Sequence, residues 1–119
     1  MTSAPFERRA QSIPVTIVAG RDEALPSIPG ATVLRVERPL HQHEAGAECV
    51  ACAARSDVRV LLFDLLERSR RGMVLPFSAV IIDARGVDDG DAIVERLLPG
   101  MQPAFGLRDH TVLRSFHLA

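Results

Sequence analysis

Hydrophobic residues along this chain fall into short runs that predict strands alternating with helices. Runs rich in β-branched residues predict strands at 13–20, 32–37 and 79–83, and the segment 111–118 is interpreted as a last strand. The first run ends in Gly20, which is typical of a buried strand that stops at a tight turn. The segment 21–30 contains two prolines and is expected to be a loop.

Two stretches have helical rather than strand spacing. Between about 53 and 71, one apolar stripe recurs at every third or fourth position: Val58, Leu61, Leu62, Leu65 and Leu66. Ser56 or Asp57 suits the first turn of this helix, and Gly72 ends it. A second helix is expected at about 89–98, where Pro99 and Gly100 stop it.

Strands that alternate with helices imply right-handed crossovers and a parallel sheet. We therefore expect a small three-layer α/β domain with a mainly parallel sheet of about four strands and helices on its faces. This domain is expected to span 13–119, after a flexible N-terminus at 1–12.

Composition narrows the class of protein. The 119 residues are 47% hydrophobic and 24% charged, as in one ordinary globular domain. The net charge of −1 gives no attraction to nucleic acid or to an anionic membrane, so neither is expected as a partner. We find no signal-peptide pattern and no apolar run near the roughly 20 residues of a membrane span, so the expected location is cytoplasmic.

The loop after the first strand is where a nucleotide-binding α/β protein places its phosphate loop, G-x-x-x-x-G-K-[ST]. Gly20 and the hydroxyl of Ser27 fall in register with that pattern, but Leu25 replaces the second glycine and Pro26 the lysine. All fourteen basic residues are arginine, so the chain has no lysine at all. Leucine adds a Cβ where glycine is needed, and proline removes an N–H donor. The loop therefore predicts no phosphate site.

Cysteine and histidine residues between the second strand and the first helix suggest metal chemistry. Cys49 and Cys52 are three positions apart, and His41 and His43 lie a few residues upstream. Thiolate and imidazole ligands suit Zn²⁺. Two other interpretations stay open: small cysteines packed at a helix N-terminus, and a redox-active pair.

Several segments together resemble the GTPase domain of CobW-type metal-handling proteins. The segment 48–58, Glu-Cys-Val-Ala-Cys-Ala-Ala-Arg-Ser-Asp-Val, is similar to that family's G-C-x-C-C-[ST]-x-R-x-D-L; Cys49, Cys52, Arg55 and Asp57 match, and Ala51 replaces the middle Cys. The segment 79–87 resembles the strand and switch V-V-I-E-[TS]-[TS]-G-L, with Asp83 at the acid and Gly86 at the glycine. Paralogues with an eroded P-loop and a C-V-x-C motif are the most similar subgroup.

The resemblance implies a P-loop-GTPase-derived domain, with zinc as the cofactor and a protein as the partner. The missing lysine and asparagine also exclude the guanine-reading N-K-x-D motif, so no GTPase activity, no GTP and no catalytic residue are expected. The leading hypothesis is a non-catalytic protein of zinc homeostasis that binds Zn²⁺ through Cys49 and Cys52, with His41 and His43. The alternatives are a pseudo-GTPase that docks a protein through the 25–27 surface without metal, and a metallochaperone with residual GTP binding.

Overall fold

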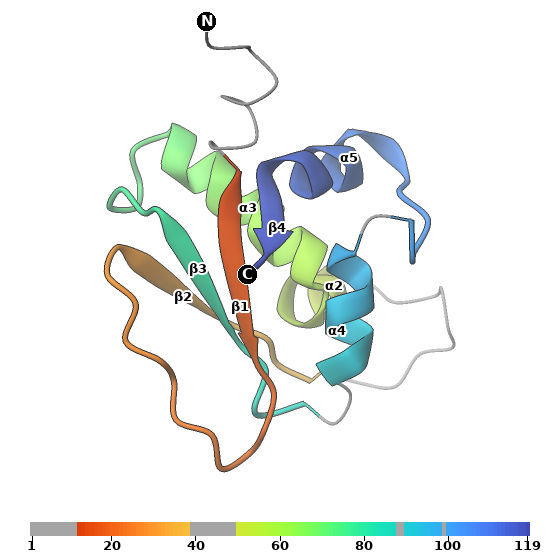
Figure 1. Cartoon of the computed structure of the whole chain (residues 1–119). Coiled ribbons are helices and arrows are strands. Elements are labelled where there is room, and N and C mark those ends of the chain that lie inside the picture. Colours follow the sequence, from red (N-terminus) through yellow and green to blue (C-terminus); the bar gives the residue numbers. More distant parts are fainter. Residues whose placement is uncertain (1–11, 39–49, 88–89, 99) are drawn as a thin grey trace, which may run out of the picture.

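The protein folds into one parallel sheet with helices packed beside it (Figure 1). The computed structural model describes residues 12–38, 50–87, 90–98 and 100–119. The flexible N-terminus expected at 1–12 therefore lies, except for Ser12, outside the described residues. The elements in chain order are β1 (Ile13–Val18), β2 (Ala31–Arg35), α2 (Val50–Ser56), α3 (Val58–Arg70), β3 (Ala79–Asp83), α4 (Gly90–Leu97), α5 (Gly106–Ser115) and β4 (Phe116–Leu118).

The strands pair in the order β2-β3-β1-β4, and every described pairing is parallel. The ladder between β1 and β3 begins at Val15, opposite Val80. Pro14 precedes it, so the donor that proline lacks is not needed by that ladder. The predicted α/β class and the mainly parallel sheet of about four strands are confirmed.

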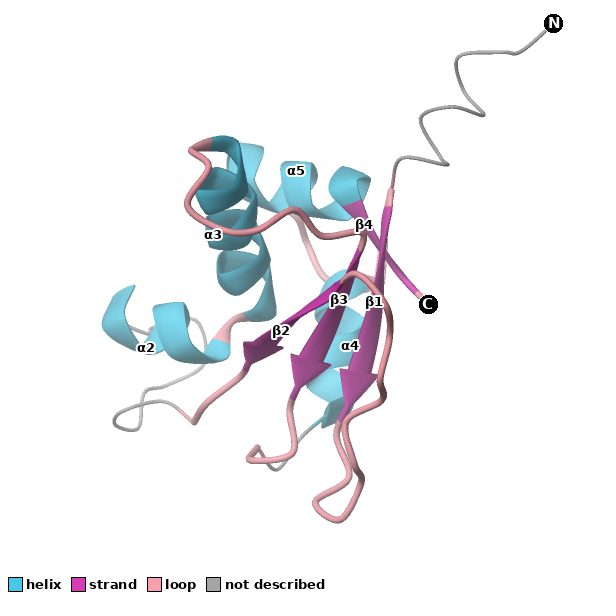
Figure 2. Ribbon diagram, turned by 90° about the vertical axis from the view of Figure 1, so that its left-hand side faces the viewer, coloured by secondary structure: helices cyan, strands magenta, loops and turns pink. Residues whose placement is uncertain are grey.

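The helices lie on one side of the sheet, whereas the sequence suggested helices on both faces. Figure 2 shows α2, α3 and α5 on one side of the sheet, while the connection from β1 to β2 runs along the other as a loop. Helix α4 belongs to the same side as α3, because Ile93 and Leu97 share one core with Leu62 of α3. Right-handed crossovers explain this division, because the chain moves across the sheet in one direction from β1 to β2 and in the opposite direction afterwards. The prolines of segment 21–30 leave that first crossover without a helix.

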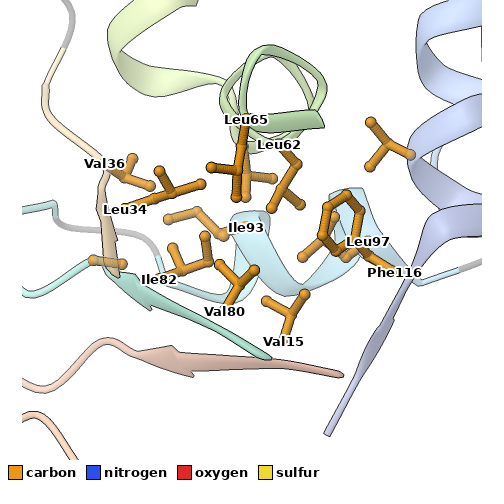
Figure 3. Close-up of a cluster of buried hydrophobic side chains, with 13 residues drawn as sticks. Val15, Leu34, Val36, Leu62, Leu65, Val80, Ile82, Ile93, Leu97 and Phe116 are labelled. Carbon is orange, nitrogen blue, oxygen red and sulfur yellow. The ribbon is translucent and has the colours of Figure 1, made fainter. Parts of the chain in front are cut away.

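A single apolar core fills the space between the sheet and the helices (Figure 3). Alternate strand residues face it, and α3, α4 and α5 each contribute one side of their surface. Its members include Val15, Leu34, Leu62, Leu65, Val80, Ile82, Ile93, Leu97, Val112 and Phe116. The five residues of β3 are all buried, because β3 lies between two other strands and is covered on both faces.

The long helix predicted at about 53–71 is divided at Asp57 into α2 and α3. The Asp57 carboxylate accepts a hydrogen bond of 3.0 Å from the Arg59 N–H and so caps the N-terminus of α3. At the other end, Gly72 has a φ of 71° and the Met73 N–H donates to the Arg68 carbonyl. The expected roles of Asp57 and Gly72 are thus confirmed, although the helix is not continuous.

The strand predicted at 111–118 is wrong for most of its length, because α5 occupies it up to Ser115 and only β4 remains. The β-branched Thr111 and Val112 suggested a strand, but tertiary contacts decide otherwise. Asp109 and Val112 are buried three positions apart, as on one face of a helix, and α5 packs against α3.

Candidate functional site

The carboxyl edge of β1 and β3 is the position where an α/β sheet of this topology binds ligands. These neighbouring strands send their connections in opposite directions, to β2 and to β4, which leaves a switch point between them. The loop after β1 and the residues after β3 lie at this edge (Figure 2). Gly90, the first residue of α4, approaches it so closely that an added Cβ would lie 2.5 Å from the Ala19 Cβ.

A carboxylate of the chain itself occupies the turn that follows β1. The Gly20 N–H donates to Glu23 Oε1 at 3.0 Å, and the Glu23 N–H donates back to the Gly20 carbonyl at 3.0 Å. A side chain at Gly20 would collide with this carboxylate. The donor that faces a phosphate in a nucleotide-binding loop is therefore used by Glu23.

Arg85 connects the end of β3 to the same turn. Its guanidinium binds the Asp83 carboxylate in bidentate fashion, with distances of 3.0 Å from Nε to Oδ1 and 3.1 Å from Nη2 to Oδ2. Its Nη1 donates to the Glu23 carbonyl at 2.9 Å. The side-chain hydrogen bond from Arg85 lowers the pKa of Asp83, and the same bond raises the pKa of Arg85. We call Glu23, Asp83 and Arg85 the edge latch.

The phosphate-loop positions lie in the loop that leaves this edge. Leu25 is half-buried, whereas Pro26 and Ser27 are exposed, and no helix begins among them. A phosphate loop needs a helix N-terminus directly after it, because that terminus supplies the donors and the positive end of the dipole. Gly20, Leu25, Pro26 and Ser27 therefore lack the local structure that the pattern requires.

Of the four predicted zinc ligands, only Cys52 lies among the described residues. His41, His43 and Cys49 fall in the segment 39–49, outside them. Cys52 belongs to α2 and is 0% exposed. In the part of the chain that the structure describes, no group of three or more His, Cys, Asp or Glu residues is placed to hold a metal ion.

Arg55 and Asp57, two residues that match the family motif, each make contacts within the fold. Arg55 forms an ion pair of 2.6 Å with Glu37, which connects α2 to the chain beyond β2. Asp57 caps α3 and also accepts a hydrogen bond of 2.7 Å from Arg96 Nη2. Both residues thus have structural roles that account for their charges.

Arg59, the most buried charged residue of the part of the chain that the structure describes, was missed by sequence reasoning. Its side chain is 0% exposed and donates to three carbonyls, of Arg96 at 2.7 Å, Pro103 at 2.8 Å and Gln102 at 3.3 Å. Nη1 also forms an ion pair of 3.2 Å with the buried Asp109. We call Arg59 and Asp109 the buried clamp, because they attach α3 to the segment between α4 and α5. The one signal in the sequence was the position of Arg59, a charged residue at the start of an apolar helical stripe.

The segment 101–107, which the buried clamp holds in place, exposes large apolar side chains. Phe105 is 75% exposed and Leu107 is 73% exposed, and Met101 is also exposed. The backbone is nevertheless anchored, because the Phe105 N–H donates to Asp109 Oδ2 at 3.1 Å and the carbonyls of Gln102 and Pro103 accept from Arg59. Large apolar side chains that are exposed together on an anchored backbone are typical of interaction surfaces.

Comparison of the chain with protein-family models, with curated proteins and with solved structures finds no significant match. The resemblance to CobW-type proteins and the derivation from a P-loop GTPase therefore stay predictions. Among the described residues, none of the helices has the length and apolar character needed to cross a membrane.

Proposed function

We propose that this chain is a non-catalytic binding domain that docks another protein through segment 101–107. The observation that carries the proposal is the combination, in one segment, of a backbone held by buried Arg59 and exposed Phe105 and Leu107 side chains. Because the backbone is ordered before binding, little conformational entropy remains to be lost on association. A partner with an apolar groove fits these side chains best.

The edge latch supports the non-catalytic part of the proposal. At the ligand-binding edge, the Gly20 N–H, the Asp83 carboxylate and the Arg85 guanidinium are engaged with one another or with Glu23. A ligand would have to displace these charge-assisted contacts before gaining its own. Binding of a phosphate or substrate at this edge is therefore disfavoured.

Partner docking is tested with matched variants. Proteins captured by the wild-type chain are purified, and binding to each is measured by calorimetry for wild type, Phe105→Ser and Leu75→Ser. Leu75 is 87% exposed in a different loop and serves as the control. We expect Phe105→Ser to weaken binding by about tenfold or more, since an interface anchor contributes more than about 1.4 kcal/mol. Equal loss in both variants, or loss in neither, overturns the proposal.

Nucleotide binding is tested separately. Titration of the chain with Mg²⁺-GTP and Mg²⁺-ATP is expected to give no saturable heat, and Pro26→Lys is expected to give none either, because Leu25 and Glu23 still oppose a phosphate. Saturable binding by the wild-type chain would contradict this expectation and would favour the hypothesis of a metallochaperone with residual GTP binding.

Zinc homeostasis through Cys49, Cys52, His41 and His43 stays a prediction. Titration with Zn²⁺ against a chelator, for wild type and for Cys49→Ser with Cys52→Ser, decides the question. An affinity that falls in the double variant supports a zinc site, and an unchanged affinity rejects it.

A further inference from the structure

Strand β2 forms one edge of the sheet, because among the described elements no strand pairs with its outer side. Among the described elements, β2 pairs only with β3. The Val36 N–H donates to the Asp83 carbonyl at 3.0 Å, and the Gly30 carbonyl accepts from the Ser78 N–H at 2.9 Å. Residues at even positions therefore bond towards β3.

Because consecutive residues of a strand direct their N–H and C=O groups to opposite sides, the odd positions of β2 face outwards. Ala31, Val33 and Arg35 occupy these positions. The Ala31 N–H donates to the Ile28 carbonyl at 3.1 Å, within the preceding turn. The outer edge of β2 thus offers the N–H and C=O of Val33, the N–H of Arg35 and the C=O of Ala31. The next outward N–H, that of Glu37, already donates to the Arg55 carbonyl of α2 at 2.9 Å, so the edge that can pair ends at Arg35.

This edge has few of the features that block pairing. The five residues of β2 include no proline, and Val33 at its centre is 50% exposed. Natural edge strands discourage pairing with charged side chains, proline or bulges, and of these β2 has one charged residue, Arg35. The opposite edge of the sheet, β4, has three residues only, which makes β2 the longer template.

We propose that a second copy of this chain pairs antiparallel with β2 about a two-fold axis at Val33. Each Val33 N–H then donates to the carbonyl of Val33 of the partner subunit. Each Arg35 N–H donates to the carbonyl of Ala31 of the partner subunit. The Ala31 N–H keeps its hydrogen bond to the Ile28 carbonyl of its own chain. The outward groups are self-complementary under this operation, which is the property that an isologous dimer requires.

The side chains suit the same register. Arg35 lies opposite the partner's Ala31, so no two like charges face each other across the axis. Val33 lies opposite the partner's Val33, and this pairing covers its half-exposed side chain. The dimer uses β2 and leaves segment 101–107 uncovered, so it is independent of the proposed function.

Sedimentation of the whole chain over a range of concentrations tests the dimer. Wild type is expected to dimerise reversibly. Val33→Pro removes an N–H that β3 does not use, so the variant is expected to keep its circular dichroism spectrum and to become monomeric. Val33→Thr keeps the N–H and the β-branch, and is expected to dimerise like wild type.

A charge-exchange experiment tests the register itself. Val33→Lys and Val33→Glu each place like charges opposite one another, and each is expected to weaken dimerisation by about tenfold or more. An equimolar mixture of the two variants is expected to recover dimerisation as a heterodimer. A monomeric wild type, a dimeric Val33→Pro or a mixture without recovery overturns the proposal.

Discussion

The buried clamp and the edge latch each contain an arginine bound to an aspartate, but the surroundings of these two ion pairs differ. Arg59 and Asp109 are enclosed, and the guanidinium has backbone carbonyls as additional acceptors. Arg85 is partly exposed, and it binds Asp83 at the rim of the sheet. Since solvent screens an exposed pair and leaves a buried one unscreened, loss of a partner should cost far more in the clamp than in the latch.

The largest effect is expected for Arg59→Met. This substitution leaves Asp109 as a buried charge without its arginine and leaves three carbonyls without their donor. We expect the free energy of unfolding to fall by about 3–5 kcal/mol, measured by urea denaturation. Adding Asp109→Leu removes the uncompensated charge and should recover part of the loss. A loss below about 1 kcal/mol would show that the clamp is equivalent to a surface pair.

The next largest effect is expected at low pH, where Asp109 should contribute more than Asp83 to the loss of stability. Burial raises the pKa of Asp109, but the Phe105 N–H together with Arg108 and Arg59 outweighs it, so the pKa lies below the ordinary value of 3.8. A lowered pKa in the folded state adds stability above pH 3.8, and this stability is lost as the pH falls through the folded-state pKa.

The test is the urea midpoint measured from about pH 6 to about pH 2.5. The wild-type midpoint should fall below about pH 4, and the fall should be smaller in Asp109→Asn, which has no carboxyl to protonate. Asp83→Asn is the comparison, since hydrogen bonding to Arg85 also lowers the pKa of Asp83. If Asp83→Asn reduces the fall of the urea midpoint and Asp109→Asn does not, the edge latch rather than the buried clamp governs stability in acid.

A smaller effect is expected for Arg85→Gln. The variant loses the bidentate pair and the bond to the Glu23 carbonyl. Water can replace part of these contacts on the Arg85 side, which is 33% exposed, but little at Asp83, whose side chain is 11% exposed. The free energy of unfolding should decrease by about 1–2 kcal/mol, more than for an exposed pair and less than for Arg59→Met. A decrease above about 2 kcal/mol in the same denaturation measurement would mean that the latch organises the loop after β1.

The smallest effect is expected for Arg68→Ala on the solvent side of α3. Arg68 pairs with Asp64 one turn earlier, at 2.9 Å, and both side chains are exposed. Such a pair contributes about 0.3–0.5 kcal/mol, so the change in unfolding free energy should be close to the error of measurement. High salt should abolish the difference between this variant and wild type.

Most of the fold could be predicted from local patterns, and the candidate site could not. The strand 79–83 and the end of a helix at Gly72 were predicted at their observed places, because a buried apolar run and a glycine act locally. The strand 111–118 failed because Asp109 and Val112 owe their helical conformation to packing against α3. The zinc hypothesis depended on residues of which only Cys52 is described.

The sequence by itself determined that this chain is an α/β domain and that its glycine-led loop lacks the residues of a phosphate site. Those conclusions follow from periodicity and from residue types, which are properties of neighbouring positions. Only the tertiary structure decided that Arg59 is buried beside Asp109, that Glu23 binds Gly20, and that β2 is an edge. Each of these depends on which distant segments meet, and the arginine that looks like a surface residue in sequence becomes the buried contact that anchors segment 101–107.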